Sequence, residues 1–69
     1  MSVPTFQEVL NQALENINAD GIRQEAEQEI KEKGITDPKQ ALALRDKAEA
    51  KIQELCSKEV TRLMMEASN

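Results

Sequence analysis

The 69-residue sequence contains no histidine, tryptophan or tyrosine, and Phe6 is its only aromatic residue. Without histidine, the usual base that activates a hydroxyl or thiol nucleophile is missing, so Ser57, Thr61 and Cys56 have no partner for nucleophilic catalysis. A short helical chain also offers little cleft in which two carboxylates can hold separated pKa values. We therefore expect neither enzymatic activity nor a cofactor.

The sequence also lacks a cluster of lysine and arginine. It has 9 Lys and Arg against 13 Asp and Glu, a net charge of -4, whereas binding to a phosphate backbone requires clustered cations. No apolar stretch approaches the roughly 20 residues that span a bilayer, and anionic lipid head groups repel an acidic chain. We expect binding neither to nucleic acid nor to a membrane.

Cysteine is represented by Cys56 alone. A lone cysteine cannot form an internal disulfide, which fits a reducing compartment. Residues 1–5 show no basic segment followed by an apolar one, so they do not have the pattern of a secretory signal. We expect a cytoplasmic protein in which Cys56 acts as a small buried apolar residue.

What the sequence does contain is a helix stop followed at once by a helix start. Gly34 suits the left-handed conformation that ends a helix, and Ile35 can fold back onto Ile30 as in a Schellman motif. Asp37 can then cap a new helix that has Pro38 at its first position. This segment predicts a tight turn between two antiparallel helical arms.

The first arm begins with Thr5 and Glu8 at the spacing of a capping box. Its apolar residues then form one stripe about 140° wide; they are Phe6, Val9, Leu10, Ala13, Leu14 and Ile17. The five-residue step from Ile17 to Ile22 would turn the next stripe nearly to the opposite side of an unbroken helix. Because poor helix formers lie between them, we predict a break near Asp20-Gly21. One continuous helix is the alternative.

The same junction has the spacing of an EF-hand calcium loop over residues 16–27. The side-chain oxygens, the turn glycine and the final glutamate of such a loop would come from Asn16, Asn18, Asp20, Gly21 and Glu27. Arg23 replaces the apolar residue usual at the eighth position, and only Asp20 and Glu27 carry charge. Two interpretations stay open: a weak calcium loop and a helix junction capped by Asp20.

The second arm is predicted as one helix from Pro38 to about Ala67, close to 45 Å long at about 1.5 Å per residue. A broad apolar arc on its C-terminal half is wider than the stripe of the first arm can cover, and adjacent methionines adapt to irregular partner surfaces. We therefore expect a protein-binding face. Its predicted residues are Phe6, Leu10, Leu55, Val60, Leu63, Met64 and Met65.

Together these patterns predict an all-α domain of residues 1–69, an antiparallel helical hairpin with a broken first arm and three helices. We expect it to assemble into a bundle as a homodimer, through the arc around Leu63 and the Phe6 stripe. The expected function is a non-catalytic protein-protein interaction module, such as a small regulator, assembly chaperone or adaptor.

The acidic residues of the first arm leave one further alternative, an inhibitor that mimics a nucleic acid and binds a basic, nucleic-acid-handling protein. The acidic face consists of Glu25, Glu27, Glu29 and Glu32. Against this alternative, Glu27 with Lys31 and Glu29 with Lys33 have the spacing of favourable ion pairs on a helix, which would neutralise much of the face.

Overall fold

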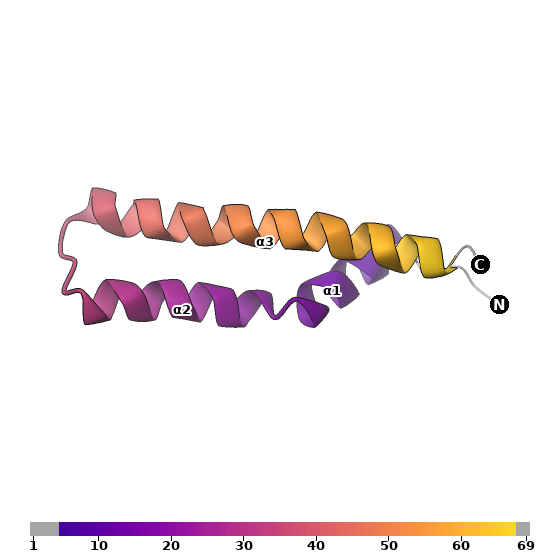
Figure 1. Cartoon of the computed structure of the whole chain (residues 1–69), viewed down its shortest axis with the longest axis horizontal. Coiled ribbons are helices and arrows are strands. Elements are labelled where there is room, and N and C mark those ends of the chain that lie inside the picture. Colours follow the sequence, from indigo (N-terminus) through magenta and orange to yellow (C-terminus); the bar gives the residue numbers. More distant parts are fainter. Residues whose placement is uncertain (1–4, 68–69) are drawn as a thin grey trace.

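The computed structural model describes residues 5–67, which form three helices, α1 (Phe6–Asn16), α2 (Ala19–Glu32) and α3 (Pro38–Ala67), and no strand. The helix α3 runs the length of the molecule, with α2 beside its first half and α1 behind its second half (Figure 1). The Cα atoms extend over 51 × 14 × 14 Å. The predicted all-α class and the hairpin with a broken first arm are confirmed. Residues 1–4, on which the prediction about a secretory signal rested, and residues 68–69 lie outside the described part.

The turn between α2 and α3 is a complete Schellman motif. The Ile35 N–H donates to the Ile30 carbonyl over 3.0 Å, and the Gly34 N–H donates to the Lys31 carbonyl over 3.2 Å. Gly34 has a φ of 62°, where a residue with a side chain would be strained. The predicted turn is therefore confirmed in its hydrogen bonds as well as in its position.

Both predicted helix starts are also capped as expected. The Thr5 hydroxyl accepts a hydrogen bond of 3.2 Å from the Glu8 N–H at the start of α1. The Asp37 carboxylate accepts one of 3.0 Å from the Lys39 N–H, directly after Pro38. Each side chain satisfies a backbone donor that the first turn of a helix leaves without a partner.

The predicted break in the first arm is present, and it lies at Ile17 and Asn18, just before the Asp20-Gly21 position near which it was expected. Asn18 adopts the left-handed conformation, with a φ of 56°. Its N–H donates to the Glu15 carbonyl and ends α1, while its carbonyl accepts from the Ile22 N–H and starts α2. Asparagine tolerates this conformation better than most residues with a side chain.

Gly21 has a different role from the predicted one, because it is a helical residue in the first turn of α2. A Cβ atom at Gly21 would lie 2.3 Å from the Asn18 side-chain nitrogen. The glycine therefore leaves room for the side chain of the residue that makes the break. The prediction rested on a run of poor helix formers, Asn16, Asn18, Asp20 and Gly21, and it did not distinguish which of them makes the break.

Most of residues 16–27, which the calcium-loop interpretation assigns to a loop, belong to the continuous helix α2. Glu27 lies about two turns along that helix from Asp20, and it is bound to Arg45. No three acidic or thiol side chains among residues 5–67 converge on a metal-sized site. The structure shows a helix junction here, but its N-cap is Asn18, which makes no side-chain capping bond, and not Asp20.

The buried core is a thin seam along α3. Its members are Ala13, Ala19, Ala26, Ala41, Ile52 and Cys56. Alanines at helix contacts let the axes approach closely, and Cys56 is buried as predicted. No large side chain in the described part is fully buried. Among α1, α2 and α3, none combines the length and hydropathy of a membrane-crossing helix.

Candidate functional site

The seam is covered only in part, because α1 and α2 are the two described helices that pack on α3. The helices α1 and α2 contact α3, and the larger apolar side chains at the edges of these contacts are only half-buried. They include Val9, Leu10, Leu14, Ile22, Leu44, Leu55, Val60 and Leu63. Each face carries a groove formed by such residues.

The first groove lies between α1 and α3, and we call it the Phe6 groove. Its apolar lining consists of Phe6, Leu10 and Leu14 from α1 and Ile52, Cys56 and Val60 from α3. Ile52 and Cys56 form a buried floor, and Phe6 stands at the mouth with 63% of its surface exposed. The polar rim consists of Arg23, Glu49, Gln53, Ser57 and Thr61.

Two ion pairs cross from α2 to α3 on the face of the Phe6 groove. Arg23 Nε lies 2.7 Å from Glu49 Oε1, and Arg45 Nε lies 2.5 Å from Glu27 Oε1. Hydrogen bonds from these guanidinium groups lower the pKa of both carboxyls. The expected pair of Glu27 with Lys31 is thus replaced by one across the hairpin, whereas Glu29 with Lys33 forms as predicted, over 2.9 Å.

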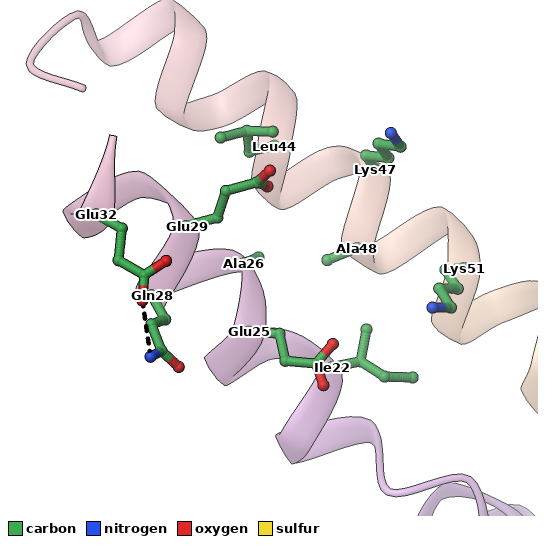
Figure 2. Close-up of a pocket in the computed structure, with 10 residues that line it drawn as sticks. All are labelled: Ile22, Glu25, Ala26, Gln28, Glu29, Glu32, Leu44, Lys47, Ala48 and Lys51. Atoms are coloured by element: carbon green, nitrogen blue, oxygen red, sulfur yellow. Dashed lines mark hydrogen bonds between the residues drawn. The ribbon is translucent and has the colours of Figure 1, made fainter. Parts of the chain in front are cut away.

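The second groove lies between α2 and α3 on the opposite face, and we call it the Leu44 groove (Figure 2). Its apolar lining consists of Ile22 and Ala26 from α2 and Leu44 and Ala48 from α3. Glu25 is two residues from both Arg23 and Glu27, and such residues point to opposite sides of a helix. The groove therefore faces away from the two ion pairs.

The two edges of the Leu44 groove carry opposite charges. The α2 edge has Glu25, Gln28, Glu29 and Glu32, and the α3 edge has Lys47 and Lys51 (Figure 2). Among the described residues no ion pair crosses this groove, and Glu29 is bound to Lys33 on its own helix. An acidic edge and a basic edge thus lie side by side without being joined.

The residues predicted to form one protein-binding face are divided among several places. Phe6, Leu10 and Val60 meet in the Phe6 groove, whereas Leu63 lines a separate shallow groove with Val9. Leu55 is half-buried and lines neither of these two grooves nor the Leu44 groove. The exposed fractions of Met64 and Met65 are 52% and 65%. The predicted arc is divided because α1 packs against α3 and contributes residues to both the Phe6 groove and the shallow groove.

Sequence reasoning missed part of the Phe6 groove and all of the Leu44 groove. The Phe6 groove also contains Leu14, Ile52 and Cys56, which belong to the predicted apolar patterns but were not among the predicted partner-binding residues. The one sequence signal of the Leu44 groove is the four-residue spacing of Leu44 and Ala48, next to Lys47 and Lys51 at the same spacing.

A polar cluster joins the C-terminal end of α1 to α3. The Glu59 carboxylate accepts hydrogen bonds from Arg62 Nε over 2.6 Å and from Asn16 Nδ2 over 2.8 Å. The hydrogen bond from Arg62, followed by the one from Asn16, lowers the pKa of Glu59 to about 2. The cluster fixes one edge of the α1–α3 contact on which the Phe6 groove depends.

This cluster predicts a pH dependence of stability. Because the Glu59 pKa falls from 4.5 to about 2 on folding, its contribution is complete above pH 4.5 and is lost as the pH falls toward 2. Glu59→Gln should therefore reduce the difference in unfolding temperature between pH 7 and pH 2.5, measured by circular dichroism. Glu54→Gln, which removes only a pair with Lys58 at 3.4 Å, is the control. Equal pH dependences in the two variants would contradict the assignment.

Comparison of the chain with models of protein families, with curated proteins and with solved structures finds no match. The argument for function therefore rests on the two grooves and on the charges around them. Their geometry is that of surfaces that other helices cover, because each is a shallow, open channel between two helices with apolar side chains at its base.

Proposed function

We propose that this chain is a non-catalytic protein-protein interaction module that binds an apolar helix of a partner protein in the Phe6 groove. One observation carries the proposal: the groove combines half-buried apolar walls with an aromatic residue, Phe6, that is 63% exposed at its mouth. A contiguous apolar surface rimmed by polar residues is typical of an interaction site.

The shape of the groove favours a helical partner. The stretch of α1 from Phe6 to Leu14 is about 12 Å long at about 1.5 Å per residue, which matches about two turns of a helix laid beside it. An amphipathic helix would fill the channel with apolar residues at positions i, i+3, i+4 and i+7. Phe6 would then be the aromatic anchor, a residue type enriched at the energetic centre of interfaces.

The residues around the groove support selective binding. Arg23 and Glu49 at one end and Ser57 and Thr61 along α3 offer polar contacts at its rim, and such groups set orientation more than affinity. Met64, one turn beyond Val60, extends the apolar surface with a side chain that adapts to irregular shapes. A small regulator, assembly chaperone or adaptor of the cytoplasm, where Cys56 stays reduced, would use the groove in this way.

Site-specific photo-crosslinking in cells tests the proposal. In one variant p-benzoylphenylalanine replaces Phe6. In a matched control this photoreactive amino acid replaces Leu42, which is 56% exposed but lies outside the Phe6 groove. We expect a discrete adduct with another protein from position 6 and none from position 42. Adding Val60→Asp should remove the adduct while circular dichroism shows an unchanged helix content.

Two outcomes would contradict the proposal. One is a set of adducts that is the same from positions 6 and 42, or that Val60→Asp leaves unchanged, because the groove would then have no selectivity. The other is an adduct only with a second copy of the chain. That result would assign the Phe6 groove to self-association, as the sequence pattern had suggested.

A further inference from the structure

The Leu44 groove differs from the opposite face in how its charges are used. On the face of the Phe6 groove, Arg23 binds Glu49 and Arg45 binds Glu27 across the hairpin. On the face of the Leu44 groove, the glutamates of α2 and the lysines of α3 form no such pair among residues 5–67. One surface therefore presents both an acidic and a basic strip, with apolar residues between them.

The two ion pairs on the face of the Phe6 groove show which residues of α2 and α3 lie at the same position along the hairpin. Glu25 lies midway between Arg23 and Glu27 in the sequence, and Lys47 lies midway between Arg45 and Glu49. Because Arg23 faces Glu49 and Glu27 faces Arg45, Glu25 and Lys47 lie at the same height. Lys51 lies one helical turn further along α3.

Two copies can bring their Leu44 grooves together by two different two-fold axes. A two-fold axis along the length of the hairpin places α2 of one copy over α3 of the other. Each residue then keeps its position along the hairpin, so equivalent residues of the two copies lie at the same level. Each Glu25 then lies at the level of Lys47 of the second copy, so opposite charges meet on both sides of the interface. An axis across the hairpin places α2 over α2 and α3 over α3, so that like charges meet.

We propose that a second copy of the chain covers the Leu44 groove, about the axis along the hairpin, to form a four-helix bundle with both turns at the same end. Charge complementarity selects this occupant and this orientation, since like charges across an interface oppose association. Such a self-complementary surface is what a two-fold dimer requires. The proposal concerns a different face from the Phe6 groove and does not depend on it.

The floor of the groove suits close packing of four helices. Ala26 and Ala48 are small, so the helices of the second copy can approach to the short end of the usual range of about 8–10 Å between axes. Ile22 and Leu44, half-buried in one copy, would then be covered. Leu55 lies seven residues after Ala48, on the same edge of α3, and would extend the contact.

A charge exchange tests the proposal, with self-association measured by sedimentation. Glu25→Lys alone and Lys47→Glu alone should each weaken the dimer about 10-fold, because each turns two attractive contacts into repulsive ones. An equal mixture of the two variants should recover the affinity, and native mass spectrometry with one variant 15N-labelled should show mainly the mixed dimer. Lys31→Glu, which makes the same charge change on an exposed position outside the groove, should behave as the wild type.

Spin labels near the C-terminal end of α3, far from the Leu44 groove, test the orientation. With Glu66→Cys, at an exposed position, as the only labelled site in a Cys56→Ala background, the same-end bundle places the two labels at a distance of about 20–30 Å, since neighbouring axes are about 10 Å apart. A dimer with the turns at opposite ends, centred on the Leu44 groove, would separate them by roughly 55–60 Å, because position 66 lies 19 residues beyond Lys47 at about 1.5 Å per residue.

Three results would overturn the proposal. They are a monomeric wild type, unchanged association in both charge-reversed variants, and a long distance between the labels. Loss of the dimer in Leu10→Asp together with its retention in Lys47→Glu would assign self-association to the Phe6 groove instead. All the residues changed in the charge exchange are exposed in the single chain, so a failure to associate would not reflect a failure to fold.

Discussion

Ile52→Ala is expected to lower the free energy of unfolding by about 2–5 kcal/mol, the usual cost of removing most of a large buried side chain. Ile52 is 3% exposed and is the only large aliphatic residue among the buried ones; the others are four alanines and Cys56. A core in a chain of this size supplies only about 3–5 kcal/mol in total. The substitution should therefore leave much of the protein unfolded at room temperature.

Urea unfolding followed by circular dichroism measures this effect. Leu42→Ala is the matched control, because Leu42 has a similar volume but is 56% exposed, and its loss should change the stability by less than about 0.5 kcal/mol. Similar midpoints for the two variants would mean that Ile52 is not the centre of the core. The dimer proposed above should reduce the loss at high protein concentration, since association stabilises the folded state.

Ala13→Leu is the second large change that we expect. Ala13 is 0% exposed where α1 packs, and adding a larger side chain to a filled contact costs about 1–3 kcal/mol. The larger residue must push α1 away from α3. This would separate the walls of the Phe6 groove while leaving the Leu44 groove, which α2 and α3 form, in place.

Two readouts separate these consequences. Photo-crosslinking from position 6 should be lost in Ala13→Leu, while the self-association measured by sedimentation should remain. Ala43→Leu, which adds the same side chain at an exposed position on α3, should change neither. Loss of both the photo-crosslinking and the self-association in Ala13→Leu would show that the two faces are not independent.

The parts of the fold that could be predicted from sequence are those that local chemistry decides. Gly34, Asp37 and Pro38 each have one conformation or hydrogen bond that they favour strongly, and the structure places all three as expected. The start of α1 at Phe6 followed in the same way from Thr5. These signals depend only on residues a few positions apart, so they can be interpreted without knowing the tertiary structure.

The break in the first arm could not be placed in the same way. Asn16, Asn18, Asp20 and Gly21 are all poor helix formers, so local preference alone does not decide which of them makes the break. The break at Asn18 is accompanied by burial of Ala19 and Ala26. Their burial depends on the tertiary packing of the helices and has no local signal.

The candidate grooves were only partly predictable for a related reason. The apolar stripe of the first arm contained Phe6 and Leu10, and the structure brings both together with Val60 in the Phe6 groove. The division of the methionine-rich arc depends on where α1 lies against α3. The charges of the Leu44 groove depend on which glutamates of α2 point toward that groove. This is known only from the structure, in which Arg23 pairs with Glu49 and Arg45 pairs with Glu27 on the opposite face.

Sedimentation equilibrium of the wild-type chain from about 1 μM to 1 mM, a range that covers weak to moderate dimers, shows whether a single hairpin is half of a bundle. We expect the mass to rise from 7.7 kDa toward twice that value as the concentration increases. A mass of 7.7 kDa at every concentration would contradict the proposed bundle, because it would mean that the hairpin does not associate with a second copy.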